Sequence, residues 1–496
     1  MSDDLPMGWV ETEIGEISQL ISGKTPKDVA QFVNHTGSIP WVKVSDMNTI
    51  GNERYISKSA ISFSESEAQK LGLPIVPLGS VIFPKNGGAI ATGKKRQTSI
   101  PCSIDLNTMA VVPKGLDQDF LFYWFKTLDL ASLSDGSVVP QINKSHISPI
   151  KISLPPLNEQ RRIVDKLDRI GDRHRTARNE LNHIPKLIAR YKQAVLAAAC
   201  SGKLTEDWRE KNPNVETASE LLRQILIRRE QRYKEKYDKS KLENKKKPRN
   251  DFADQIPSIE SEVEISIPKT WVITNIDYLA HVTKLAGFEY TEHFRTNDVA
   301  GIPIIRAQNV QMNKFIETNI KYISEDVSNY LERSQLHGRE VLMVFIGAGT
   351  GNVCLAPQGR RWHLAPNVAK IDVDEISSNY LCLYLQSSIG QNYVDLWTKS
   401  TAQPSLSMET IRKIIVLLPP LEEQKEIVRR VEKMFEKIDM MEQEYQKATK
   451  LCDRLEQATL AKAFRGELVP QDPDDEPASV LLEQVKSQKE KGKKGK

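Results

Sequence analysis

A glycine-rich turn in the second half of the chain has the residue types of a cofactor-binding loop. The string VLMVFIGAGTGN at 341–352 is an apolar run that leads into three glycines, as in the cofactor loop of a methyltransferase or a dinucleotide-binding fold. A loop of that kind opens a helix whose N-terminus faces the ligand. Here Pro357, Gly359 and Pro366 follow, and they would interrupt such a helix. We therefore predict a strand, a flexible turn and a second strand, without a cofactor.

Other catalytic and metal-binding motifs are missing from the sequence. It has no Asn-Pro-Pro-aromatic or Asp-Pro-Pro-aromatic string of an amino-methyltransferase, no P-loop and no H-E-x-x-H, and no PD…(D/E)xK nuclease cluster is evident. The eight histidines are dispersed, and the five cysteines are scattered without C-x-x-C spacing, which favours reduced thiols over a disulfide or zinc framework. We expect neither a catalytic site nor a metal site, and we favour a binding or scaffolding component over an enzyme.

The chain is duplicated. The string LPPLNEQRRIVDKLDRI at 154–170 returns as LPPLEEQKEIVRRVEKM at 418–434, an offset of 264 residues, with eight of seventeen positions identical. At the same offset, LAAACSGKL at 196–204 corresponds to LAKAFRGEL at 460–468. Further matched residues are Pro6 and Pro268, Trp9 and Trp271, Pro140 and Pro404, and Ile147 and Ile411. A period of this size indicates a duplicated domain and not a solenoid.

Each repeat ends in a predicted long helix. The two prolines of Leu-Pro-Pro-Leu suit the residues just before a helix or its first turn. The next forty or so residues place an apolar side chain about every 3.5 positions between charged ones, which is the pattern of a coiled-coil seam. We expect the two stripes to face each other in antiparallel helices. The predicted seam residues are Ile163, Leu167, Ile170, Leu181, Ile184 and Ile188 in the first helix, and Ile427, Val431, Met434, Ile438, Met441 and Leu455 in the second.

The stretches before the helices read as globular domains. Short runs such as SVIFP, MAVVP, VLMVFI and AKIDV are broken by Gly, Pro, Asn and Asp, which indicates strands joined by tight turns. The predicted fold class is α+β, with two mixed α/β domains, two long antiparallel coiled-coil helices and an internal pseudo-two-fold duplication. The predicted segments are a first domain (1–153), a first helix (154–204), a charged linker (205–265), a second domain (266–417), a second helix (418–466) and a basic tail (467–496).

Composition limits the class of protein. The longest apolar run, AVLAAAC at 194–200, falls well short of the roughly 18 residues that cross a bilayer. The N-terminus, MSDDLPMGW, carries acidic residues where a signal peptide would carry basic ones, so we expect no membrane segment and a cytoplasmic location. The net charge of +4 does not by itself indicate a nucleic-acid partner. Basic runs at 223–249 and in the last nine residues fit solvated segments, although they would also attract phosphates.

The paired LPPLxEQ strings carry a resemblance to a known family. Each ends a globular domain and starts a long helix, with SGKL or RGEL beyond. In this arrangement the chain resembles the specificity subunit of Type I restriction-modification enzymes over essentially its whole length. The segments GSVVPQINKSHISPIKI at 136–152 and TAQPSLSMETIRKIIV at 401–416 resemble the ends of that family's target-recognition domains. One departure is the long, highly charged 205–265 linker.

The resemblance implies a non-catalytic reader of double-stranded DNA. Each target-recognition domain would read one half of a split sequence, and the paired helices would act as a ruler that fixes the unread gap. Two modification subunits would dock around the helices and methylate adenine with S-adenosylmethionine, while restriction subunits that use ATP and Mg²⁺ would complete the complex. No cofactor is expected on this chain itself. Two similar domains on a rigid rod also suit two half-sites about one turn of B-DNA apart.

Loop residues of suitable chemistry are the candidates for contact with DNA. Arg and Lys pair with guanine, and Asn and Gln pair with adenine, when a loop carries them into a groove. An ordinary solvated loop remains the alternative for each residue. The candidates are Lys85, Asn86, Lys94, Lys95, Arg96 and Gln97 in the first domain, and Arg306, Gln308, Asn309, Asn352, Gln358, Arg360 and Arg361 in the second.

Two other functions compete with this one. A free-standing DNA methyltransferase or nuclease would rest on the GAGTG turn, and it would require the isolated chain to bind the cofactor. A structural coiled-coil protein without a DNA role would explain the helices but not two large duplicated domains. We expect the specificity subunit.

Overall fold

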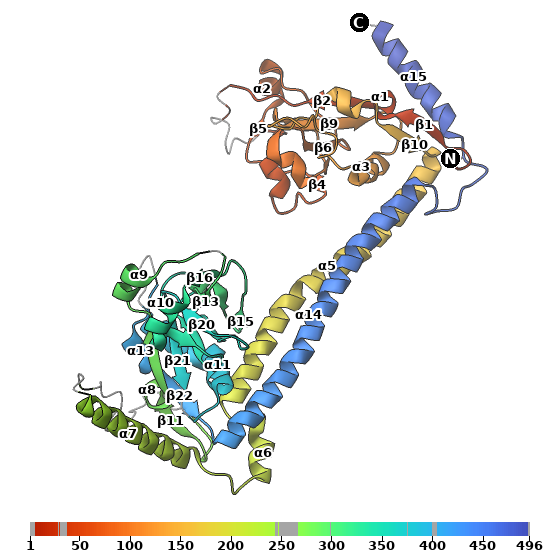
Figure 1. Cartoon of the computed structure of the whole chain (residues 1–496). Helices are drawn as coiled ribbons and strands as arrows, with labels where there is room; N and C mark the ends of the chain where they lie inside the picture. Colours follow the sequence, from red (N-terminus) through yellow and green to blue (C-terminus); the bar gives the residue numbers. More distant parts are fainter. Residues whose placement is uncertain are drawn as a thin grey trace. The chain divides into compact units, whose positions relative to one another are not determined.

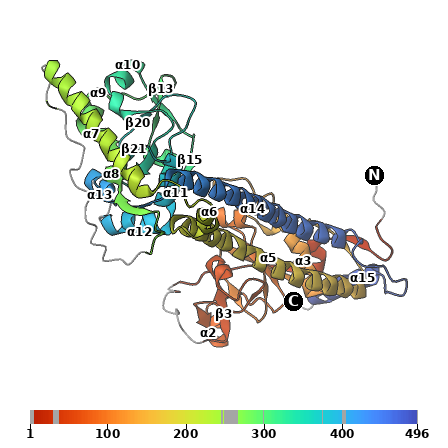
Figure 2. The same cartoon turned by 90° about the horizontal axis from the view of Figure 1, so that it is seen from below.

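The structure is a computed structural model, and it divides into two compact units (Figures 1 and 2). Unit 1 comprises Met1–Asn182 and Tyr445–Lys496, and unit 2 comprises His183–Glu444. Each unit therefore contains one globular domain and a part of each long helix. The residues that the structure describes are 5–27, 29, 37–243, 247, 266–297, 299–373, 375–398 and 404–494, the side chains of 490–494 excepted.

The first domain is built on two sheets and one apolar helix. The helix α3 (Gln118–Thr127) starts at Asp117, whose carboxylate accepts the backbone N–H groups of Asp119 and Phe120. Its aromatic residues are buried against the larger sheet. That sheet has the order β2 (Ser18–Ser22), β9 (Thr108–Pro113), β6 (Val81–Pro84), β7 (Arg96–Thr98) and β4 (Tyr55–Ile56). The smaller one has the order β5 (Ser62–Phe63), β3 (Ile39–Val42) and β8 (Ser103–Ile104).

The second domain repeats this plan. The helix α11 (Ser378–Gln386) corresponds to α3, and α12 (Ser388–Trp397) follows it. The predicted strand-turn-strand at 341–352 is confirmed, because β18 (Val341–Val344) and β19 (Val353–Leu355) pair as antiparallel neighbours across the glycine-rich turn. One sheet has the order β12 (Ala280–Lys284), β21 (Val368–Val373), β18 (Val341–Val344) and β19 (Val353–Leu355). The other has the order β16 (Lys321–Ile323), β13 (Ile302–Ile305), β20 (Trp362–Leu364) and β17 (Gln335–Leu336).

Each domain is closed by its first and last strands. In the first domain β1 (Val10–Glu13) pairs antiparallel with β10 (Lys151–Leu154). In the second domain β11 (Val272–Asn275) pairs in the same register with β22 (Ile415–Leu418). Each last strand leads through two prolines into a long helix, so the exit of each domain fixes the start of the helix that follows.

The two long helices, α5 (Leu157–Cys200) and α14 (Leu421–Phe464), run antiparallel within each unit. In unit 1 the start of α5 shares a core with the end of α14, and Arg178 pairs with Asp453 at 2.5 Å. In unit 2 the end of α5 shares a core with the start of α14, and Lys192 lies 3.6 Å from Asp439. The predicted long helices and the mixed α/β class are thus both confirmed.

The predicted seam is covered unevenly. Ile163, Leu167, Ile427, Val431 and Ile438 are buried. Against the expectation, the side chains of Met441 and Leu455 are 54% and 51% exposed, because two helices bury only the side on which they face each other. The remaining predicted seam residues are half-buried: Ile170, Leu181, Ile184, Ile188 and Met434.

The predicted linker and tail contain helices that pack on the domains. In the linker, α6 (Glu206–Lys211) is followed by α7 (Ala218–Leu242), whose Leu222 is buried in the core of the second domain. The 467–496 tail contains α15 (Ala478–Lys494), whose Leu482 is buried in the core of the first domain. Residues 244–246 and 248–265 of the linker lie outside the described residues.

Candidate functional site

Two loops meet at one end of the central strands in the first domain. The backbone N–H of Gly87 donates to the carbonyl of Pro140 at 2.8 Å, and that of Ile142 donates to the carbonyl of Lys85 at 2.8 Å. Gly87 has a φ of +66°, and a Cβ at Gly87 or Gly88 would meet nothing within 4 Å. The loop is therefore open at this edge, and its backbone is accessible to a large ligand.

The second domain has the same pair of loops. The N–H of Gly347 donates to the carbonyl of Pro404 at 3.0 Å, and the N–H of Leu406 donates to the carbonyl of Phe345 at 2.8 Å. The glycine-rich turn is therefore one half of a repeated two-loop edge. We call this edge the loop edge of each domain: segments 85–88 and 135–142 in the first, and 345–351 and 404–406 in the second.

The loop edge of the first domain carries exposed residues that are not among the candidates predicted from the sequence. Val138 is fully exposed, Val139 is 58% exposed, and Gln141 is also exposed. The available signal was an apolar pair between Gly136 and Pro140, both turn residues that do not continue a core strand. Val138 and Val139 therefore add an apolar contact surface next to Lys85 and Asn86, which are half-buried.

Three of the six candidates in the first domain face inward, and a fourth, Lys94, is bonded at the surface. Lys94 hydrogen-bonds to the Asn48 side chain, and Lys95 donates to the Leu128 carbonyl at 2.5 Å. Arg96 donates to the Met47 carbonyl at 2.8 Å. Burial lowers the pKa of Lys95 to about 8 and also lowers the pKa of Arg96. Gln97 is fully buried in β7, so it is out of reach of a DNA base in this conformation.

The arginine candidates of the second domain organise one surface segment. Arg306 hydrogen-bonds to the Asn319 carbonyl. Arg360 pairs with Glu317 at 2.5 Å, and its guanidinium lies 4.4 Å from the centre of the Trp362 ring. Arg361 pairs with Glu325 at 2.9 Å. The ion pairs of Arg360 and Arg361 lie at the surface, where such pairs contribute little to stability.

The amide candidates of the second domain divide into buried and exposed side chains. Asn309 is buried and donates to the carbonyls of Ile316 and Thr318 at 2.9 and 3.0 Å. Asn352 is half-buried and donates to the Val310 carbonyl at 3.3 Å. Gln308 and Gln358 are exposed. Asn309 thus supports the surface from inside, whereas the two glutamines are accessible.

The Glu-Gln pair of each LPPLxEQ motif fastens a domain to its helix. The Trp9 indole N–H donates to Glu159 at 3.0 Å, and the Trp271 indole N–H donates to Glu423 at 2.9 Å. Gln160 accepts the Asp117 N–H at 2.9 Å and donates to the Pro155 carbonyl at 2.9 Å. Gln424 does the same with Ser377 and Pro419. The motif therefore ties the first turn of the long helix to both ends of its domain.

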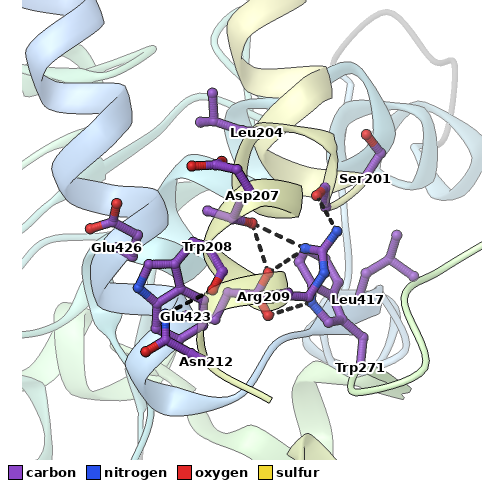
Figure 3. Close-up of polar contacts among 12 residues, drawn as sticks. Ser201, Leu204, Asp207, Trp208, Arg209, Asn212, Trp271, Leu417, Glu423 and Glu426 are labelled. Atoms are coloured by element: carbon purple, nitrogen blue, oxygen red, sulfur yellow. Dashed lines mark hydrogen bonds and ion pairs between the residues drawn. The ribbon is translucent and has the colours of Figure 1, made fainter. Parts of the chain in front are cut away.

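The second junction also holds α6 (Figure 3). Glu423 accepts a hydrogen bond from the Thr205 hydroxyl at 2.7 Å and lies 2.5 Å from the Arg209 guanidinium. Arg209 in turn donates to the Gly202 carbonyl at 2.7 Å. Glu423 is fully buried and the Arg209 side chain is 19% exposed, so the carboxylate end of this ion pair is shielded from solvent.

The first junction is built differently. Glu159 accepts a hydrogen bond from the neutral Gln471 side chain at 3.2 Å in place of an arginine. Burial raises the pKa of Glu159, although the bonds from Gln471 and Trp9 oppose that shift. Arg162 pairs instead with Asp475 at 2.6 Å. The segment after each long helix is thus fastened to the junction of the unit in which that helix ends.

The described residues offer neither a metal site nor a membrane-spanning helix. In that part of the chain no group of three His, Cys, Asp or Glu side chains could hold a metal ion. The same residues include no helix that is long and apolar enough to cross a membrane.

Known proteins resemble this chain over almost its whole length. The family model for the Type I restriction modification DNA specificity domain matches residues 6–186 and again 268–450. The Type I restriction enzyme EcoKI specificity subunit of Escherichia coli K12 is 26% identical, over 98% of this chain and 96% of its own. The EcoBI specificity subunit of Escherichia coli is 27% identical, over 97% and 92%.

Solved structures share the fold. The HsdS subunit from Thermoanaerobacter tengcongensis has a TM-score of 0.51 and 17% identity, and the match covers 94% of this chain and 98% of that one. A chain from a structure that describes complex assembly and conformational transition of the type I R-M system has a TM-score of 0.59 and 17% identity, with 94% and 100% covered. Both match the chain across its two domains and its helices.

Proposed function

The chain belongs to the Type I restriction modification DNA specificity family, and we propose that it reads a bipartite DNA target with one half-site for each domain. The observation that carries this proposal is the duplicated match to the family, together with a loop edge of the same construction in each domain. We call residues 1–153 the first recognition domain and residues 266–417 the second. S-adenosylmethionine, ATP and Mg²⁺ would be used by partner subunits in the cytoplasm, where the DNA is.

The loop edges are the surfaces that we propose for base reading. In the first recognition domain, Lys85 suits guanine or a phosphate, Asn86 and Gln141 suit adenine, and Val138 suits the methyl group of thymine. The open space around Gly87 and Gly88 would let the backbone approach the DNA closely. In the second domain, the proposed set also includes residues outside the loop edge, namely Gln308, Gln358 and the three arginines.

The spacer formed by α5 and α14 is proposed to set the gap between the half-sites. Each helix has 44 residues, and the junctions fasten each domain to the first turn of one of them. A base pair adds about 3.4 Å to a duplex, and a helical residue adds about 1.5 Å. Changes in helix length would therefore change the gap in steps of one or two base pairs.

Matched apolar pairs on the spacer are proposed as docking sites for two modification subunits. Leu187 and Tyr191 on α5 are 59% and 47% exposed, and Leu451 and Leu455, which occupy the same positions of the repeat on α14, are 64% and 51% exposed. Residues four apart lie on one face of a helix, so each pair forms an apolar contact point. One such pair lies in each unit, which supports one modification subunit for each.

The test is a reconstituted methylation assay with labelled S-adenosylmethionine. The purified chain alone should transfer no methyl group, the modification subunit alone should show no sequence preference, and the two together should methylate adenine in a bipartite target. Methyl transfer by the pure chain would support the competing methyltransferase instead. A sequence preference that is the same without the chain would refute the proposed function.

A further inference from the structure

An arginine of the first recognition domain reaches the spacer helix. Arg54 lies immediately before β4, and its Nη1 donates to Asp168 of α5 at 2.5 Å. Its Nη2 donates to Asp119 of α3 at 2.8 Å. The hydroxyl of Tyr123, also in α3, hydrogen-bonds to the same Asp168 carboxylate. One guanidinium therefore joins three elements: the edge of the sheet, the apolar helix and the spacer.

The surroundings of Arg54 favour a fixed geometry. Its guanidinium carbon lies 4.8 Å from the centre of the Tyr55 ring, 5.5 Å from that of Phe122 and 5.1 Å from that of Tyr123. A planar guanidinium that is stacked on rings and held by two carboxylates has few alternative orientations. Its side chain is only 23% exposed, so these ion pairs are screened less than pairs in open solvent.

The same residue is bonded to the strand that ends the 85–97 segment. The backbone carbonyl of Arg54 accepts the N–H of Gln97 at 2.9 Å, and β4 runs parallel to β7 with Tyr55 opposite Gln97. The neighbouring residue, Arg96, donates a hydrogen bond from its side chain to the Met47 carbonyl. Arg54 thus contacts the spacer through its side chain. Through its backbone it contacts β7, the strand that ends the 85–97 segment of the first domain.

The described part of the second recognition domain does not repeat this connection. The position that matches Asp168 in the repeat holds Glu432, which is exposed. The helices α3 and α11 align through Asp117 and Ser377, whose N–H groups donate to the two motif glutamines. In that alignment Leu383, which has no hydroxyl, stands where the first domain has Tyr123. Among the described residues, the connection is therefore found in the first domain.

We propose that Arg54, with Asp168 and Tyr123, forms a latch that sets how the first recognition domain is seated on the spacer, and so how the first half-site is phased against the second. This inference rests on the proposed function, because it presupposes a split target with a fixed gap. The three residues are positioning residues that contact no DNA. Without the latch the domain remains attached through Glu159, Gln160 and the core that α3 shares with the long helices, but its orientation on the spacer is less restricted.

The test uses the complex of the full chain with its modification subunit and a series of duplexes. The duplexes carry the natural gap, or a gap one base pair shorter or longer, and the methylation rate is measured on each. In Asp168→Asn the rate on the natural gap, divided by the rate on the altered gaps, should fall about fivefold, as expected for one weakened and partly exposed charged contact. The preference for the half-site sequences should stay unchanged.

Two variants support this comparison. Glu432→Gln makes the same chemical change at the matched position of the second half and should leave the ratio unchanged. Tyr123→Phe removes the hydroxyl that donates to Asp168 and accepts a hydrogen bond from Arg54 at 3.3 Å. It should lower the ratio in the same direction, which provides a second measurement if Asp168→Asn folds poorly.

Three outcomes separate the inference from the function beneath it. An unchanged ratio in both Asp168→Asn and Tyr123→Phe would overturn the latch, and so would an equal loss of rate on every gap, which is what a merely stabilising contact would give. A wild-type complex that methylates all gaps equally would instead overturn the proposed split target.

Discussion

The buried glutamate of each LPPLxEQ motif joins several chain segments through one side chain. The Glu423 carboxylate accepts hydrogen bonds from Trp271, at the start of the second domain, and from Thr205 and Arg209, in the segment after α5. The Glu159 carboxylate accepts hydrogen bonds from Trp9 and from the neutral side chain of Gln471. Only one of the two junctions is therefore a buried ion pair, although the motif is the same in both.

This difference predicts unequal costs for the same substitution. Glu423→Gln should destabilise the protein by about 3 kcal/mol, because it leaves Arg209, whose side chain is only 19% exposed, without its counter-charge. Glu159→Gln should cost about 1 kcal/mol, since its two partners are neutral and one hydrogen bond is lost. Urea unfolding followed by circular dichroism measures both, with the exposed Glu422→Gln as the control. Equal losses would mean that Arg209 finds another partner.

Val138, in the loop edge of the first domain, is expected to contribute to the choice of bases in the first half-site. A fully exposed valine at a loop tip fits the thymine methyl group. Val138→Ser should therefore change the relative methylation rates of targets with single substitutions in the first half-site by about fivefold. The second half-site should be unaffected. Leu78→Ser is the control, because Leu78 is 56% exposed near the opposite end of β6, and a similar change there would contradict the assignment.

The sequence located these loops better than it located their side chains. Glycines beside Lys and Asn predicted an accessible turn, and Gly87 and Gly88 are indeed open. Gln97 lies in β7, a strand of only three residues, and Lys95 directly precedes it. So short a strand leaves no periodicity from which to infer which side chains face inward.

At the scale of elements, the long helices were predictable and the helices after them were not. An apolar seam that repeats over about forty residues is a strong signal for a helix, and it predicted the helices α5 and α14. By contrast, α7 and α15 are dominated by charged residues, which read as a linker and a tail. The repeat ASELL at 218–222 and ASVLL at 478–482 was the available signal, and both leucine pairs pack on a domain.

Spacer length should control the unread gap. Four residues inserted between Leu181 and Pro185 of α5, with four more between Tyr445 and Thr449 of α14, add about one turn, or about 6 Å, to each helix. The gap should grow by about one or two base pairs, with unchanged half-sites, as read from the adenine methylation pattern. Four residues inserted between Pro213 and Asn214, in the turn before α7, should leave the gap as it is. If the gap stayed the same length after the helical insertions, the spacer would not set the distance between the half-sites.

The matched apolar pairs should each bind one modification subunit. Leu187→Glu with Tyr191→Glu should lower the number of bound modification subunits from two to one, and so should Leu451→Glu with Leu455→Glu, because a charge opposes burial in an apolar interface. Native mass spectrometry counts the subunits. Leu242→Glu, at a position 88% exposed on α7, is the control. Two bound subunits in both double variants would place the docking sites elsewhere.

At the scale of the whole molecule, both ends of the chain build the first recognition domain. The N–H of Ala478 donates to the Gly8 carbonyl at 2.9 Å, and Lys489 donates to the Gly15 carbonyl at 2.5 Å. Val485 is buried against Gly115, where a Cβ would lie only 2.5 Å from it. The equivalent bond in the second domain joins Ala218 to the Thr270 carbonyl at 3.0 Å. The duplication therefore includes these closing helices, and an exchange of the first domain should include the 467–496 tail.

The most direct test of the account is an adenine methylome of cells that express the modification subunit with a hybrid chain. In the hybrid, residues 1–153 and 467–496 are replaced by their counterparts from a relative with a different target. The account predicts that one half-site changes to that of the relative, while the other half-site and the gap stay as they are with the native chain. A motif that is unchanged, or that changes in both halves, would contradict the claim that each domain reads its own half of the target.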